Sequence, residues 1–271
     1  MGDVTNNKKA PVFPGAYKSD RAVRASDARA FARQNGGFRV LRSRLWQLQM
    51  QLRPMYKNQP KKDYKMFYST DLNQHGLAQD PFKVIVAPRP IGWITSMSLQ
   101  GEINLAPYSY FNGVCSMPPI VCFSSEGRKD TLTFIEETKE FVCNLATYEL
   151  RWAVNETSAS YPRGVNEMIG AGLTPTESNF VGPPRIAQVP CALECKWLQT
   201  LSLRDIVGRP LDNHVVFGQV VGVYIDDRYI NNNRLDTSAL RPIARCGGND
   251  YAVVDTVFSM VRPKTPATKL I

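Results

Sequence analysis

The stretch APRPIGWITSMSLQGEINLAPYSYF, residues 87–111, contains two strand-like runs, Ile91–Ser98 and Ile103–Tyr110, joined by the turn Leu99–Glu102. Gly, Thr, Ser and Asn occupy positions where a core strand usually carries Val or Leu. Small side chains with hydroxyls and amides allow a flat ligand to approach the backbone and hydrogen-bond to it. The pattern therefore predicts an antiparallel hairpin, which either has one wet face or forms the wall of a ligand site.

The same hairpin begins a series of motifs that extends through the chain. They read PRPIGWITS (88–96), NLAPYSYFNGV (104–114), MPPIVCFSSEGRKDT (117–131), EFVCNL (140–145), HVVFGQVVG (214–222) and ARCGGNDYAVVD (244–255). With these motifs in this order, the region from Met66 to about Pro263 resembles the flavin reductase-like, FMN-binding split-barrel family, of the flavoredoxin type. The resemblance covers about three quarters of the chain.

Short β-like segments dominate from Met66 onward. We expect strands at 91–98, 103–110, 119–124, 140–145, 191–200, 214–225 and 251–258, and helices at Thr131–Lys139, Glu149–Thr157 and Val165–Ala171. Many antiparallel strands with a few inserted helices predict a mainly β fold, closed or partly closed into a barrel. The resemblance implies the FMN-binding split β-barrel, working as a homodimer.

The positive charge of the chain is concentrated at its N-terminus. Residues 1–65 hold 15 of the 33 Lys and Arg but 4 of the 24 Asp and Glu, so the remainder is slightly acidic. We expect two parts, a basic, partly helical and partly disordered extension with a linker over 1–65, and the flavin reductase-like domain over 66–271. A leucine stripe over Arg39–Arg53 predicts an amphipathic helix that docks on the body, on a partner or on a membrane. The near-neutral body argues against nucleic-acid binding there.

Several other classes of protein are disfavoured by the sequence. No stretch approaches the roughly 20 apolar residues of a membrane span, and six cysteines without a secretory signal indicate reduced thiols in the cytoplasm. With two histidines, a zinc site is not expected. The glycines do not follow the G-x-G-x-x-G pattern of a Rossmann dehydrogenase, and the serines lack a G-x-S-x-G elbow.

The resemblance implies an FMN phosphate site at the start of the helix expected from Thr131. The free N–H groups and positive dipole end of that helix favour an anion, and two cations precede it. Asp130 is assigned as an N-cap or a ribityl contact. The candidate residues are Arg128, Lys129, Asp130 and Thr131; the alternative is an ordinary capped surface helix with solvated charges.

The resemblance also implies contacts to the ribityl chain and the flavin ring. Thr95 and Ser96 offer hydroxyls to the phosphate or ribityl group, and Trp93 lies near the ring or in the core. The segment expected to run beside the ring contains Asn104, Ala106, Pro107, Tyr108, Ser109 and Phe111. Backbone groups of Ala106–Ser109 are expected to contact the N3, O2 and O4 edge.

His214 is the candidate catalytic residue, because the segment from Asp212 resembles the family's Asp-His element, with one extra residue between the two. Its expected use is positional or electrostatic, since hydride transfer to flavin N5 needs no enzyme base. The alternative is a histidine at the start of a core strand.

The resemblance, together with these residues, implies an NAD(P)H-dependent flavin reductase. Hydride passes from NADH or NADPH to flavin N5, and the electrons then go to free flavin, a partner monooxygenase or another acceptor. The alternative is a non-enzymatic FMN electron carrier of flavoredoxin type. A nucleic-acid or membrane protein would depend on residues 1–65 alone.

Overall fold

The structure is a computed structural model that describes residues 66–263. The basic extension, with its expected amphipathic helix and linker, lies outside the described residues. The chain divides into two compact units, Met1–His75 and Gly76–Ile271. In the described part of the first unit, the rings of Tyr68 and His75 lie 5.1 Å apart. The boundary expected between the basic extension (1–65) and the flavin reductase-like domain (66–271) stays a prediction.

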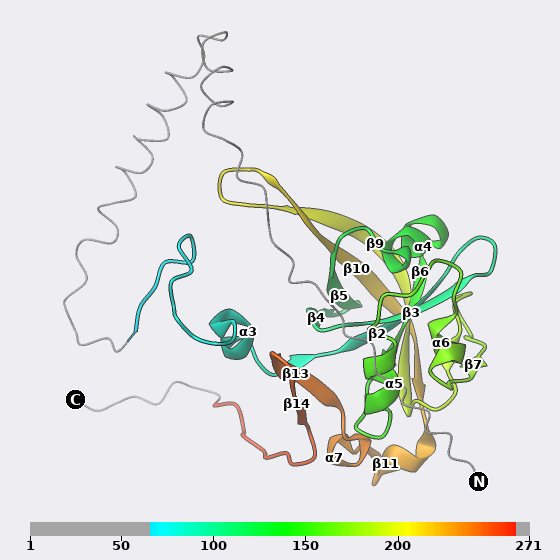
Figure 1. Cartoon of the computed structure of the whole chain (residues 1–271). Coiled ribbons are helices and arrows are strands. Elements are labelled where there is room, and N and C mark those ends of the chain that lie inside the picture. The colour runs from blue at the N-terminus through cyan, green and yellow to red at the C-terminus, as the bar shows by residue number, and fades with distance from the viewer. Residues whose placement is uncertain (1–65, 264–271) are drawn as a thin grey trace, which may run out of the picture. The chain divides into compact units, whose positions relative to one another are not determined.

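The second unit is mainly β, with short helices between the strands (Figure 1). The helical elements are α3 (Pro81–Ile85), α4 (Asp130–Thr138), α5 (Arg151–Glu156), α6 (Glu167–Gly170), η1 (Asp227–Tyr229) and α7 (Thr237–Leu240). The strands are β1 (Arg89–Pro90), β2 (Gly92–Met97), β3 (Ile103–Tyr108), β4 (Phe111–Ser116), β5 (Pro119–Glu126), β6 (Glu140–Leu145), β7 (Pro175–Thr176), β8 (Arg185–Ile186), β9 (Cys191–Arg204), β10 (Pro210–Ile225), β11 (Ile230–Asn231), β12 (Arg234–Leu235), β13 (Ile243–Gly247) and β14 (Asp250–Val253).

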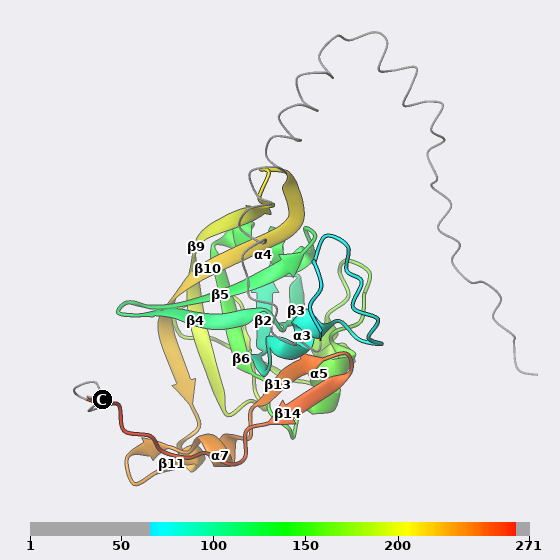
Figure 2. The ribbon, with the colours of Figure 1, turned by 90° about the vertical axis from the view of Figure 1, so that its left-hand side faces the viewer.

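Seven strands form one antiparallel sheet in the order β3-β2-β6-β9-β10-β5-β4. β3 and β4 lie at opposite edges of this order, yet the bend at Ser109 and Tyr110 is all that separates them in the chain. The sheet must therefore curl until its edges approach. Two contacts between the β3–β2 edge and the β5–β4 edge show this curvature. The Tyr108 and Phe123 ring centroids are 4.7 Å apart, and the Phe111 ring packs on Gly92. Figure 2 shows β4, β5, β10 and β9 side by side on the curved wall.

The expected hairpin is formed by β2 and β3. Its register pairs Gly92 with Tyr108 and Met97 with Ile103, and Gly101 takes a φ of +85° in the turn. A wet outer face was one alternative for this hairpin, but the structure shows β2 buried on both faces. β2 is an interior strand, between β3 and β6.

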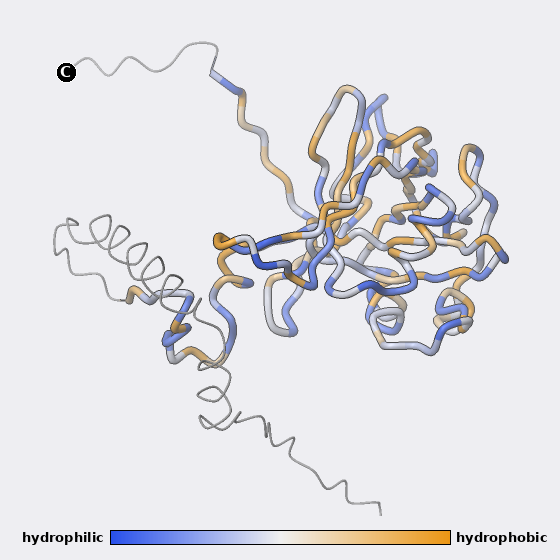
Figure 3. Tube along the Cα trace, turned by 90° about the horizontal axis from the view of Figure 1, so that it is seen from above, coloured by the Kyte–Doolittle hydropathy of each residue, from blue (hydrophilic) through white to orange (hydrophobic). Residues whose placement is uncertain are grey.

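Two apolar clusters explain this double burial. Alternate residues of a strand point to opposite faces, so Trp93 joins one cluster and Ile94 the other. Ile94 packs with Phe123 and Phe141 inside the barrel. Trp93 packs on the outer face against residues of α5 and α6, among them Val154 and Met168. Figure 3 shows hydrophobic and hydrophilic stretches alternating along the chain trace.

A second, three-stranded sheet with the order β1-β13-β14 was only partly expected. The strand expected over 251–258 is β14, which ends at Val253, and the residues from 254 to 263 carry no strand. α3 lies beside β13: a Cβ on Gly247 would come within 3.2 Å of the Lys83 carbonyl oxygen. Gly247 also has a φ of +107°, so both its conformation and its surroundings favour glycine.

The six cysteines are all free. Among the helices of residues 66–263, none is long and apolar enough to cross a membrane. In the same residues no group of three or more His, Cys, Asp or Glu side chains is arranged to hold a metal ion.

Candidate functional site

A cavity of about 770 Å³ lies along the β3 edge of the barrel. Its walls come from α3, β1, β3, the end of β5, the start of α4, the loop 157–161, α6, the start of β10 and the end of β13. A volume of this size is within the range of small-molecule and cofactor sites. Because β3 is an edge strand, one side of its backbone is not paired with another strand and can bind a ligand.

The start of α4 supplies a cationic wall. The N-cap residue is Lys129 and not Asp130, which is the first residue of the helix. The Lys129 carbonyl oxygen accepts the N–H groups of Leu132 and Thr133 at 3.0 and 3.1 Å. Asp130 and Thr131 precede these two donors, so their N–H groups belong to the open end of the helix, and both residues line the cavity with Lys129. One ammonium group therefore lies beside a helix N-terminus, and both groups favour a bound anion.

A buried polar network closes the cavity at this end. The Asn104 amide lies 2.7 Å from Thr131 Oγ1. With its oxygen toward Thr131, the amide nitrogen donates to Glu167 Oε1 at 3.3 Å. Glu167 Oε2 accepts the Leu105 N–H at 3.0 Å, which ties α6 to β3. Burial raises the pKa of Glu167, against the effect of the Leu105 N–H, and the charge of Asp130 raises it further.

Tyr108 presents a buried phenol at the same wall. The residue is 7% exposed, and its fully buried hydroxyl lies beside the Thr131 and Ser125 hydroxyls, outside ordinary hydrogen-bond geometry. Burial raises its pKa, which the Thr131 and Ser125 hydroxyls only partly oppose. Ser125 does not line the cavity, so this hydroxyl belongs to the buried side of the wall.

The structure brings most of the predicted site residues together. The cavity is lined by Asn104, Ala106, Pro107, Tyr108, Ser109, Lys129, Asp130 and Thr131. The other six do not line it: Trp93, Thr95, Ser96, Phe111, Arg128 and His214.

Three of those six are interior residues of β2. Trp93, Thr95 and Ser96 are 0% exposed. Thr95 Oγ1 accepts the Asn144 amide at 2.9 Å, so its hydroxyl is used inside the sheet. Trp93 Nε1 donates to Thr157 Oγ1 at 2.9 Å, and Thr157 does line the cavity. Trp93 therefore positions a cavity residue rather than lining the cavity itself.

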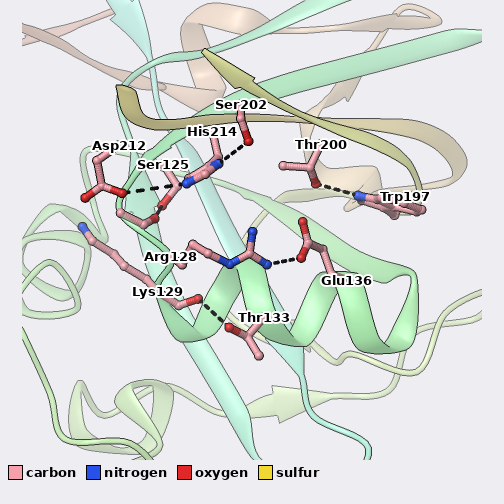
Figure 4. Close-up of polar contacts among 11 residues, drawn as sticks. Ser125, Arg128, Lys129, Thr133, Glu136, Trp197, Thr200, Ser202, Asp212 and His214 are labelled. Carbon is pink, nitrogen blue, oxygen red and sulfur yellow. Dashed lines mark hydrogen bonds and ion pairs between the residues drawn. The ribbon is translucent and has the colours of Figure 1, made fainter. Parts of the chain in front are cut away.

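Arg128 and Phe111 are directed elsewhere. The Arg128 guanidinium pairs with Glu136 on the next turns of α4, while the Lys129 side chain leaves the backbone in another direction (Figure 4). Phe111 fills the space over Gly92, where a Cβ would come within 2.5 Å of its ring. It closes the barrel seam.

His214 lies on the opposite face of β10 from the cavity. Strand register pairs Asn213 with Glu126, both of which line the cavity, and pairs His214 with Ser125, which does not. His214 is 8% exposed, with Nδ1 3.1 Å from Ser202 Oγ and Nε2 3.8 Å from Asp212 Oδ1 (Figure 4). This geometry keeps His214 out of the cavity, so the catalytic role expected for it stays a prediction.

A family model described as the flavin reductase like domain matches residues 86–237. The chain belongs to this family. An uncharacterized protein of Aquifex aeolicus is 36% identical over 173 residues, which are 62% of this chain and 85% of the relative. The crystal structure of nitrilotriacetate monooxygenase component B from Bacillus cereus is similar at 28% identity and a TM-score of 0.66, covering 73% of this chain and 100% of that one.

The fold is the split barrel of this family, as the sequence predicted. A split-barrel-domain protein from Shewanella frigidimarina matches at 21% identity and a TM-score of 0.63, over 73% of this chain and 100% of that one. Membership in the flavin reductase-like family indicates a flavin oxidoreductase type of function.

Several cavity residues of this flavin reductase-like chain were not anticipated. Glu167 follows an N-cap asparagine on a four-residue helix, with no local signal for a site. Arg89 and Arg245 lie in quoted motifs, but their meeting depends on the pairing of β1 with β13. The loop 157–161 has no motif at all.

Proposed function

We propose that this chain binds FMN in the β3 cavity and reduces it with NADH or NADPH. The observation that carries the proposal is that one cavity joins the N-terminal end of α4 to the free edge of β3. This arrangement supports a phosphate site and a flat, partly apolar wall in one continuous space.

The phosphate end fits a dianion. Lys129 supplies the charge, the N–H groups at the start of α4 supply donors, and the Thr131 hydroxyl lies on the same wall. Asp130 and Glu167 oppose an anion there. The raised pKa of Glu167 reduces this opposition, because the carboxyl keeps its proton to a higher pH.

The ring end fits the edge of an isoalloxazine. The outward backbone groups of β3 between Ala106 and Ser109 face no neighbouring strand. Ala106 and Pro107 line the cavity with small apolar surfaces. When bound, FMN supplies the hydride-accepting chemistry.

The chain's own residues hold and orient this group. The Glu167 bond to Leu105 N–H fixes the β3 backbone, and Trp93 fixes Thr157 in the facing loop. His214, through its place opposite Ser125, supports the β5–β10 wall. Such positioning is the main protein contribution where the cofactor carries out the redox step.

The electrons then pass to free flavin or to a partner oxygenase. The similarity to nitrilotriacetate monooxygenase component B supports a partner of this kind. A homodimer is part of the proposal, because β4, the turn after it and the β9–β10 hairpin carry exposed apolar side chains, among them Val114, Met117, Leu201 and Leu211.

An anaerobic spectral experiment tests the reaction. The full chain is saturated with FMN, and NADH or NADPH is added without oxygen. Loss of the visible flavin absorbance at a rate above that of free FMN supports the reductase. Tight FMN binding without bleaching by either donor would instead establish the electron carrier.

A further inference from the structure

The cavity has a second cationic wall, at the end away from α4. Arg89 of β1 and Arg245 of β13 are directly opposite in the strand ladder, and both line the cavity with Lys83 of α3. Like charges directly opposite in an antiparallel pair are destabilising. Two facing arginines therefore call for a compensating negative charge.

No such charge is supplied by the described residues. Within 66–263, none of these three cations lies within 4.0 Å of a carboxylate oxygen. Arg89 donates to the carbonyl oxygens of Lys83, at 2.5 Å, and Val86. Arg89 is 6% exposed, and its Nε has no hydrogen-bond partner among the described residues. A buried guanidinium held by neutral carbonyls alone is incompletely compensated.

The other arginine is also held by neutral groups. Arg245 donates to the Tyr251 hydroxyl and the Gly248 carbonyl oxygen. The carboxylate on this side of the cavity, Asp80, accepts the Phe82 N–H at 3.0 Å as the N-cap of α3.

The two cationic walls lie toward different ends of the cavity. The cavity follows β3 from Asn104 to Tyr108, about 13 Å of extended strand, and continues past the bend to Tyr110. Arg89 lies 5.4 Å over the Tyr110 ring, and Lys129 lies at the Asn104–Thr131 end. A mononucleotide anchored at Lys129 therefore extends its ring toward the arginines.

We propose that Arg89, Arg245 and Lys83 bind the diphosphate of the nicotinamide dinucleotide donor. This inference rests on the proposed function, since the donor must bring its reacting carbon to within about 3–3.5 Å of the ring. The guanidinium fork matches phosphate oxygens. Without a dinucleotide glycine fingerprint in the sequence, side-chain cations have to hold the diphosphate.

ADP, which carries a diphosphate but no hydride, is the probe. Its affinity for the FMN-saturated full chain is measured by calorimetry, after the FMN affinity of each variant. Arg245→Gln is expected to weaken ADP binding about tenfold or more, the loss of one charge-assisted contact, and to leave FMN affinity unchanged. Arg228→Gln is the matched control, because this arginine pairs with Asp226 on an exposed 3-10 helix and is not part of the cavity.

A second variant protects the test from misfolding. Arg245→Lys keeps the charge but loses the fork, so its ADP affinity should lie between those of wild type and Arg245→Gln. Thermal melting of each variant identifies a loss that follows from unfolding, which would lower FMN affinity as well.

The possible results distinguish failure of the diphosphate site from failure of the proposed function. Equal ADP affinity in Arg245→Gln and Arg228→Gln, with FMN bound normally, overturns the diphosphate site and leaves the proposed function. Loss of FMN in Arg245→Gln but not in Lys129→Ala would place the FMN phosphate at the arginines, which also overturns it. Absence of flavin binding in wild type removes the proposed function and this inference together.

Discussion

Lys129→Ala is the substitution that most directly tests the phosphate end of the cavity. Lys129 is exposed, its side chain makes no capping bond, and its structural contacts use its backbone carbonyl. Removing the ammonium should therefore change the free energy of unfolding by about 0.5 kcal/mol or less. FMN affinity should fall, because a charge-assisted contact to phosphate is lost.

The size of the fall follows from that contact. A hydrogen bond to a charged group contributes about 1.5–3 kcal/mol. At about 1.4 kcal/mol for each factor of ten, this corresponds to roughly a 10- to 150-fold weaker FMN affinity. Quenching of flavin fluorescence during titration measures it directly.

Two controls isolate the phosphate. Arg128→Ala removes an adjacent cation that pairs with Glu136 and does not line the cavity, so FMN affinity should change little. Riboflavin lacks the phosphate, so Lys129→Ala should leave riboflavin affinity unchanged. Equal losses in the two variants, or an equal loss for riboflavin, would show that the phosphate is not held by Lys129.

Three further predictions concern stability and the extension. Gly218→Ala should destabilise the fold by about 1–3 kcal/mol in urea unfolding, because its Cβ would lie 2.3 Å from the buried Phe141 ring; unchanged stability would contradict this packing. Because the pKa of Glu167 is raised in the folded state, its stabilising effect is present below the ordinary value of 4.5 and is lost as pH rises through the folded pKa. Relative to Glu167→Gln, wild type should therefore lose stability from acid toward neutral pH, and parallel pH profiles would refute the shift. Deleting residues 1–65 should leave FMN affinity unchanged, since the cavity is formed by residues 78–248; a truncated chain without flavin would make the extension structural.

Local patterns predicted the parts of the fold that depend on neighbours in the chain. The β2–β3 hairpin and α4 begin and end within one or two residues of their expected bounds, because turn glycine and helical periodicity are local signals. The cavity residues on β3 and at Lys129–Thr131 came from the family resemblance, through motifs that are contiguous in sequence.

The remaining features depend on tertiary structure. β2 carries hydroxyls that suggested ligand contacts, but its position between β3 and β6 buries Thr95 and Ser96. β4 has Asn, Gly and Ser in an exposed edge strand, so its composition resembles a loop. Arg89 and Arg245 are over 150 residues apart and meet only through the β1–β13 pairing, which no local pattern encodes.

Titration of the full chain with FMN is the measurement that tests the central claim most directly. In our account, a phosphate site at α4 and a free β3 edge lie in one cavity. We therefore predict that FMN fluorescence is quenched and that quenching saturates at one FMN per chain. Riboflavin, which lacks the phosphate, should bind with lower affinity than FMN. Absence of quenching, or riboflavin binding as tightly as FMN, would contradict the account.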